Sequence, residues 1–191
     1  MRILIAALAG ALAMFVWVMV AHTLTPLGSM GLRPMPAEAT TLQALHLTLG
    51  DKPGFYAFPS EENGPGGAAG KADHVAKLKN GPSGLLIYHP PGTPAVTFRQ
   101  VGLEFVLALV EALLVTLSLG LIAGAPRRLG GAVLIGLVAA TATNLAYWNW
   151  YGFAGDYTLA AAFTELVKFA LAGAVITPLL AWRRGLARGM R

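Results

Sequence analysis

Long apolar runs separated by polar stretches dominate the pattern of this 191-residue chain. Four runs are long enough to cross a hydrocarbon core of about 30 Å as helices that rise about 1.5 Å per residue. They cover residues 3–21, 101–123, 130–147 and 157–182. The pattern predicts an all-α membrane protein built as a bundle of four transmembrane helices.

The polar stretch 22–100 separates the first two runs and has its own pattern of elements. Residues 37–47 predict a short helix, and residues 71–79 predict a second, polar one. Residues 54–59 and 84–89 predict two strands, because each segment is aromatic or branched and is followed or closed by a proline. We therefore expect a small α+β cap between helices 1 and 2.

Arginines beside the apolar runs predict the orientation of the chain. Short cytoplasmic segments next to spans retain Lys and Arg, whereas long loops cross the membrane regardless of charge. A four-span chain puts these arginines on one side: Arg2, Arg127, Arg128, Arg183, Arg184, Arg188 and Arg191. We expect a multi-pass protein of the bacterial inner membrane with both termini cytoplasmic, including a basic tail at 183–191. The cap and a short aromatic turn at 148–156 then face the periplasm.

The first run could be a cleaved signal peptide or a retained signal anchor. It is longer than the usual apolar region of a signal peptide, and residues 18–21 lack the small-x-small pattern that a signal peptidase favours. We expect residues 3–21 to be retained as transmembrane helix 1.

Composition agrees with a membrane protein and narrows the chemistry. The chain is 55% hydrophobic and only 12% charged, and its mean hydropathy is +0.61. It has no cysteine, which excludes disulfides, thiolate metal sites and a cysteine nucleophile. The basic isoelectric point of about 9.8 is explained by the cytoplasmic arginines and their attraction to anionic lipid, so no nucleic acid partner is expected.

The sequence carries no convincing catalytic, metal or cofactor motif. The four histidines lack the i, i+4 spacing and the carboxylate companions of a metal site: His22, His46, His74 and His89. Ser83 stands in a glycine-rich turn that misses the spacing of a nucleophile elbow. We expect no catalytic residue, no metal and no cofactor.

Aromatic side chains gather in the turn between the last two runs. The candidates for an interface are Trp148, Trp150, Tyr151, Phe153 and Tyr157. Such residues anchor helices at the membrane surface. Because amphipathic aromatics are also common at interfaces, the alternative is a docking surface for a partner subunit, a lipid or a quinone headgroup.

Ionisable residues inside the spans are the best functional signal. Glu104 and Glu111 share one stripe of the second helix, and Glu165 and Lys168 are neighbours on the fourth. An unpaired charge in mid-bilayer costs at least about 2.5–3.5 kcal/mol, so these groups should face one another or water. We expect Glu111, Glu165 and Lys168 to converge inside the bundle.

The third helix offers a groove in which another helix can pack closely. Small residues and an amide recur every four positions at Ala132, Gly136, Ala140 and Asn144. We expect Asn144, with Thr141 and Thr143, to add neutral donors to the polar cluster. The cluster is then either a buried ion pair that fixes helix register or a proton or cation relay.

Three motifs together resemble a known family. They are Gly-Phe-Tyr-Ala-Phe-Pro at 54–59, Gly-Pro-Ser-Gly-Leu-Leu-Ile-Tyr-His-Pro at 81–90 and Tyr-Trp-Asn-Trp-Tyr-Gly-Phe at 147–153. The combination is similar to a family of small bacterial inner-membrane proteins that has no assigned activity. The resemblance covers most of the chain from residue 37 onward, and it implies the topology but no catalytic residues.

Three functions are compatible with these observations. The leading hypothesis is a non-enzymatic accessory or assembly subunit that binds another membrane complex, with the lipid bilayer and a membrane protein or a second copy as partners. The alternative is a small proton- or ion-translocating protein that uses Glu111, Glu165 and Lys168. A third is a membrane enzyme that acts on lipid or quinone at the outer surface.

Overall fold

The computed structural model describes residues 1–60 and 68–186. The chain divides into two compact units, each treated separately. A helical unit contains Met1–Leu32 and Val96–Arg191, and an α+β unit contains Arg33–Ala95. The apolar runs and the cap predicted from the sequence fall into different units.

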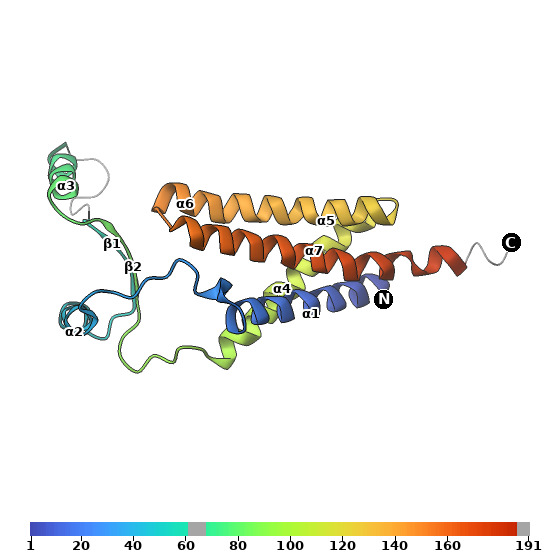
Figure 1. The fold of residues 1–191 in the computed structure, drawn as a ribbon, viewed down its shortest axis with the longest axis horizontal. Coiled ribbons are helices and arrows are strands. Elements are labelled where there is room, and N and C mark those ends of the chain that lie inside the picture. Colours follow the sequence, from blue (N-terminus) through green and yellow to red (C-terminus); the bar gives the residue numbers. More distant parts are fainter. Residues whose placement is uncertain (61–67, 187–191) are drawn as a thin grey trace. The chain divides into compact units, whose positions relative to one another are not determined.

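Within the described residues, four long apolar helices form the helical unit (Figure 1). Two of them are α1 (Arg2–Thr23) and α4 (Phe98–Gly120). The third is continuous through α5 (Ala125–Ala140), a π-helical turn η2 (Thr141–Leu145) and α6 (Ala146–Tyr151). The fourth is α7 (Gly155–Leu186). Each is long and apolar enough to cross a membrane, which confirms the predicted architecture. This is an integral membrane protein.

The second helix begins and ends three residues earlier than predicted, at 98–120 instead of 101–123. Thr97 and Gln100 form a capping box. The Thr97 hydroxyl accepts a hydrogen bond from the backbone N–H of Gln100 at 3.2 Å, and the side-chain oxygen of Gln100 accepts one from the backbone N–H of Thr97 at 2.7 Å. These bonds satisfy backbone donors of the first turn and fix the start of the helix. Hydropathy alone misses this polar cap.

The third and fourth helices are also longer than predicted. The third includes Pro126 in its first turn, where proline is tolerated, and it continues through residues 148–151 of the predicted aromatic turn. It ends at Gly152, whose φ of 68° is a left-handed conformation that glycine adopts without strain. Of the predicted tail 183–191, residues 183–186 continue α7 and residues 187–191 lie outside the described residues.

The helices pack through small residues. α1 lies against α4 and α7, and α7 packs in turn against α1 and α5 (Figure 1). Many of the buried positions are alanines, including Ala6, Ala11, Ala108, Ala112 and Ala172. Small side chains let helix backbones approach closely, which favours association within a bilayer. Large apolar side chains on the other faces are exposed and are suited to contact lipid.

The small-residue groove predicted on the third helix is filled by α7. Ala132, Gly136 and Ala140 are buried. A Cβ atom added to Gly136 would lie 3.1 Å from the Cβ of Phe169, so the two backbones are close at this point. The sequence pattern therefore identified a real packing surface, and its partner belongs to the same chain.

A short segment after α1 packs on the start of α7. Thr25 caps the 3₁₀ turn η1 (Pro26–Gly28) by accepting from the Leu27 amide at 3.2 Å. Gly31 follows with a φ of 81°, and an added Cβ would lie 2.6 Å from the Tyr157 amide nitrogen. Only glycine fits both the conformation and the space.

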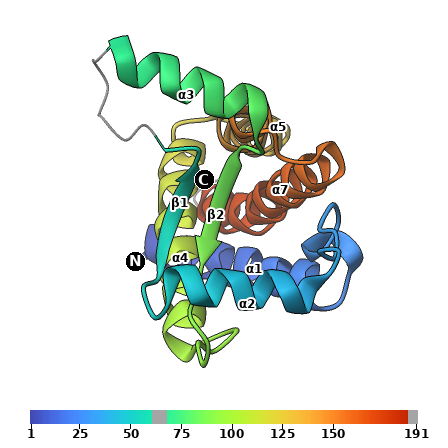
Figure 2. The ribbon, with the colours of Figure 1, turned by 90° about the vertical axis from the view of Figure 1, so that its left-hand side faces the viewer.

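The α+β unit contains the two predicted strands and both predicted helices. β1 (Gly54–Phe58) and β2 (Gly84–Tyr88) pair antiparallel, with Phe55 opposite Ile87 and Ala57 opposite Leu85. α2 (Glu38–Leu49) and α3 (Ala68–Asn80) lie at opposite ends of this pair (Figure 2). The Tyr88 hydroxyl donates to the Gly50 carbonyl at 2.9 Å, which ties β2 to the end of α2.

Candidate functional site

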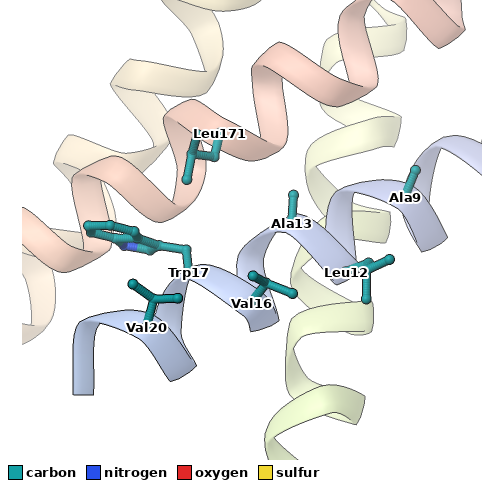
Figure 3. A pocket seen from close by; sticks show the side chains of 7 residues that line it. All are labelled: Ala9, Leu12, Ala13, Val16, Trp17, Val20 and Leu171. Carbon is teal, nitrogen blue, oxygen red and sulfur yellow. The ribbon is translucent and has the colours of Figure 1, made fainter. Parts of the chain in front are cut away.

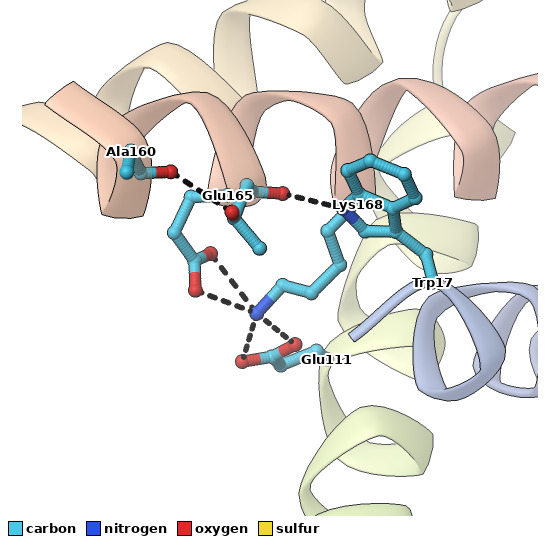
Figure 4. A network of polar contacts seen from close by, with 6 residues as sticks. Trp17, Glu111, Ala160, Glu165 and Lys168 are labelled. Carbon is cyan, nitrogen blue, oxygen red and sulfur yellow. Dashed lines mark hydrogen bonds and ion pairs between the residues drawn. The ribbon is translucent and has the colours of Figure 1, made fainter. Parts of the chain in front are cut away.

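Lys168 of α7 is held between two carboxylates from different helices (Figure 4). Its Nζ lies 3.0 and 2.9 Å from the two oxygens of Glu165, one helical turn earlier. The same Nζ lies 3.3 and 3.0 Å from the two oxygens of Glu111 on α4. We call Glu111, Glu165 and Lys168 the charged triad. It joins α4 to α7.

The triad lies near the middle of the candidate spans. Lys168 is thirteen residues from each end of the apolar segment Gly155–Ala181, and Glu111 is thirteen residues from the start of Phe98–Gly120. At about 1.5 Å per residue, thirteen residues correspond to roughly 20 Å of helix. No bulk water reaches this depth in a bilayer unless the protein provides a path.

Exposure is unequal within the triad. The Lys168 side chain is 7% exposed, whereas the side chains of Glu111 and Glu165 are 37% and 31% exposed. The lysine is thus enclosed by its own chain, and part of each glutamate side chain is exposed. The exposed part is what another molecule could reach.

Hydrogen-bonding capacity is also unbalanced. An ammonium group supplies three donors, whereas two ionised carboxylates offer four oxygens with about eight acceptor sites. Among the described residues, no other hydrogen bond or ion pair reaches Glu111 or Glu165. With both carboxylates ionised the triad carries one excess negative charge. It has room for a further donor or a proton.

Contacts between α1 and α7 fix the helix that carries the lysine. The Trp17 indole Nε1 of α1 donates to the Thr164 carbonyl at 2.9 Å (Figure 4). The Thr164 hydroxyl donates to the Ala160 carbonyl at 2.8 Å, and Lys168 Nζ lies 5.1 Å from the centre of the Phe169 ring. Trp17 therefore positions α7 one turn from the lysine.

Four residues predicted to join the cluster form no hydrogen bond or ion pair with the triad among the described residues: Glu104, Thr141, Thr143 and Asn144. Glu104 is partly buried on α4, but in the described part of the chain it makes no ion pair or hydrogen bond. Asn144 is partly buried, and Thr141 and Thr143 are exposed; within the described parts of the chain, no hydrogen bond connects any of the three to Lys168. These three residues lie in the π-helical turn η2, whose wider winding alters the four-residue repeat of the groove at that point.

The aromatic residues at the α6 and α7 junction divide into two groups. Phe153 contacts three tyrosine rings with centroid distances of 5.5–6.4 Å: Tyr147, Tyr151 and Tyr157. Trp148 and Trp150 belong to no ring pair of the described residues and are exposed. The tyrosines and Phe153 therefore stabilise the turn, and the two tryptophans are available to lipid or a partner.

An apolar hollow lies on the surface between α1 and α7 (Figure 3). Its lining is aliphatic apart from one indole: Ala9, Leu12, Ala13, Val16, Trp17, Val20 and Leu171. The indole N–H is already bonded to the Thr164 carbonyl. The hollow lies within the spans and suits a lipid acyl chain better than a polar ligand.

Arg128 has a structural role that the sequence did not indicate. It is 4% exposed, and its Nε donates to the carbonyls of Leu119 and Ile122 at 3.1 and 2.9 Å. These acceptors belong to the end of α4 and the turn that follows it. A cation there satisfies free carbonyls and complements the negative end of the helix dipole. Only its position shortly after an apolar run could have suggested this capping role.

Comparison with known proteins does not identify a relative of this chain. No protein-family model, curated protein or solved structure matches the chain. The resemblance of the motifs at 54–59, 81–90 and 147–153 to a family of inner-membrane proteins stays a prediction. The triad and the exposed surfaces are therefore the observations that bear on function.

Proposed function

We propose that the protein is a non-enzymatic accessory or assembly subunit of the bacterial inner membrane that binds another membrane protein inside the bilayer. The observation that supports this proposal is the charged triad, with two glutamate side chains partly exposed in the middle of the spans. Its partner presents a basic residue or a hydrogen-bond donor at the same depth.

The energetics favour a partner over lipid at this surface. A charged side chain at the bilayer centre costs about 2.5–3.5 kcal/mol or more when lipid surrounds it. Lys168 offsets one negative charge of the triad and leaves the other without a counter-charge. A donor from a neighbouring helix would offset it, and interhelical hydrogen bonds in bilayers contribute roughly 0.6–2 kcal/mol each.

The arginines at one end of the helical unit support the expected orientation. Arg2, Arg127 and Arg128 lie where α1 begins and α4 leads into α5, at the end where α7 also finishes (Figure 1). By the preference of short cytoplasmic segments for arginine, this end faces the cytoplasm. Trp148 and Trp150 then stand at the periplasmic surface, where they extend the partner contact beyond the triad.

The test compares two Glu-to-Gln variants on the same helix. The tagged chain is extracted from its native membrane in lipid nanodiscs, and the proteins that accompany it are identified by mass spectrometry. Glu111→Gln removes the excess charge and leaves a neutral pair of Lys168 and Glu165, so the partner should be lost while the fold persists. Glu104→Gln is the matched control, because Glu104 lies outside the triad.

One outcome would contradict the accessory role, and another would contradict the part that the triad plays in it. The wild-type chain could run alone or only as a homo-oligomer in native nanodiscs. Alternatively, the same partner could be recovered equally with wild type and with Glu111→Gln, which would separate the partner contact from the triad.

The spare acceptor capacity of the carboxylates also supports a second function, proton or ion translocation through Glu111, Glu165 and Lys168. A carboxylate that can take up a proton in mid-bilayer is suitable chemistry for a relay. The purified chain in liposomes should then carry a proton or cation flux that Glu111→Gln abolishes and Glu104→Gln preserves. A wild-type protein that shows no flux excludes this function.

A further inference from the structure

One face of the two-stranded sheet in the α+β unit is apolar and is left exposed by the described residues. Phe55 and Ala57 of β1 stand opposite Ile87 and Leu85 of β2, so the four side chains share one face. Phe55 and Ile87 are 67% and 69% exposed, and the other two are also exposed. We call these four residues the apolar sheet face.

The opposite face of the same sheet is more buried. Tyr56, Leu86 and Tyr88 are less exposed than their neighbours along the strands, whereas Phe58 at the end of this face is 43% exposed. The Tyr56 hydroxyl donates to the Lys52 carbonyl at 3.0 Å, and the Tyr88 hydroxyl donates to the Gly50 carbonyl at 2.9 Å. Among the described residues of the unit, the apolar sheet face is therefore the more exposed side of the sheet.

Both connections of the α+β unit lead to candidate membrane spans, which keeps the unit within reach of a bilayer surface. The unit is joined at one end to α1 and at the other to α4, both of which are candidate membrane spans. Nine residues separate Tyr88 from Phe98 at the start of α4, and the ten steps from one to the other extend at most about 35 Å. Both connections also carry exposed apolar side chains: Leu24, Leu32, Val96 and Phe98. Exposed apolar side chains are thus present where the chain leaves the spans as well as on the sheet.

The charge of the unit points to apolar rather than electrostatic attachment. Residues 33–95 contain five basic and five acidic residues, so their formal net charge is zero. A basic surface would bind anionic lipid and respond strongly to salt. A neutral unit with an apolar face gains most from burying that face among lipid chains near the headgroups.

We propose that the apolar sheet face inserts into the bilayer surface at which α1 ends and α4 begins. Phe55 and Ile87 enter furthest, because they are the largest and most exposed side chains of the face. The sheet is then a membrane-surface anchor that is independent of any partner of the triad. Attachment requires no anionic lipid.

The test uses the absence of cysteine from the chain. The variants Ile87→Cys and Phe55→Cys each carry one thiol for an environment-sensitive fluorophore. Leu86→Cys is the matched control, since it is the adjacent residue on the opposite face. The full-length protein is placed at one copy per nanodisc in zwitterionic phosphatidylcholine, with and without lipids that carry a nitroxide near the headgroup.

Insertion predicts blue-shifted emission at positions 87 and 55, several-fold stronger quenching by the nitroxide lipids than at position 86, and little change with salt. Aqueous iodide should quench the label at position 86 more than the labels at 87 and 55. Iodide quenching at 87 and 55 that equals or exceeds the quenching at 86 overturns the proposal. Protection that appears only in discs with two copies also overturns it, because a second copy of the chain then covers the face.

Discussion

Replacement of Lys168 by methionine is the most direct perturbation of the charged triad. Methionine keeps an unbranched side chain of similar length beside Phe169 but removes the ammonium that holds Glu111 and Glu165. Two carboxylates then face each other near the centre of the spans with no cation between them. Repulsion and desolvation should both destabilise the contact between α4 and α7.

The magnitude follows from the burial of each group. Removing one partner of a fully buried ion pair costs about 3–5 kcal/mol. Here the two carboxylates are about one third exposed, so we expect a smaller loss, about 2–3 kcal/mol of unfolding free energy. The triple variant Glu111→Gln, Glu165→Gln, Lys168→Met carries no charge at this position, and it should recover most of that loss.

The assay is equilibrium unfolding by sodium dodecyl sulfate in mixed micelles, followed by tryptophan fluorescence. Trp17 reports directly, because its indole bonds to α7 one turn from position 168. Glu111→Gln alone should change stability by less than about 1 kcal/mol, since the remaining pair is neutral. The reasoning is refuted if Lys168→Met is as stable as wild type, or if the triple variant is no more stable than Lys168→Met.

Two further predictions concern helix packing and use the same assay. Gly173→Ala should destabilise the protein by about 1–3 kcal/mol, because the added Cβ would overlap the Ala132 methyl, whereas Gly102→Ala meets no atom within 4 Å and should be neutral or slightly stabilising. Arg128→Ala should cost about 1–3 kcal/mol, because it leaves carbonyls at the end of α4 without their donor; the neighbouring, exposed Arg127→Ala should cost little, and equal effects of the two would contradict the capping role.

Hydrophobic patterning was sufficient to predict the architecture. The number of spans, the α+β unit between the first two and both strands follow from periodicity and composition, since a bilayer requires long uninterrupted apolar helices. The helix ends were less accurate. They depend on individual side chains, such as Thr97 at the start of α4 and Gly152 after α6, which average hydropathy does not register.

Part of the triad was predictable because it is local. Glu165 and Lys168 are three residues apart on one helix, and that spacing fixes them as neighbours wherever the helix lies. The cost of an unpaired charge in mid-bilayer predicts that Glu111 joins them, and the structure brings its carboxylate within 3.3 Å of the Lys168 Nζ. For Arg128 the sequence predicts only a place among the cytoplasmic arginines. No spacing rule indicates that an arginine will donate hydrogen bonds to carbonyls at the end of the preceding helix.

Glu104 shows what the spacing of residues on one helix cannot predict. It shares a stripe with Glu111, and seven residues, about 10 Å of helix, separate the two carboxylates. In the structure α4 packs mainly along α1 and meets α7 over a much shorter length, so α7 pairs with Glu111 and leaves Glu104 without a partner in the described residues. Sequence spacing determines which face a residue occupies, whereas the crossing of two helices determines which turn of that face finds a partner. Because the same crossing leaves the Glu111 and Glu165 carboxylates partly uncovered, a third helix that approaches α4 and α7 there would meet the triad before it met Glu104.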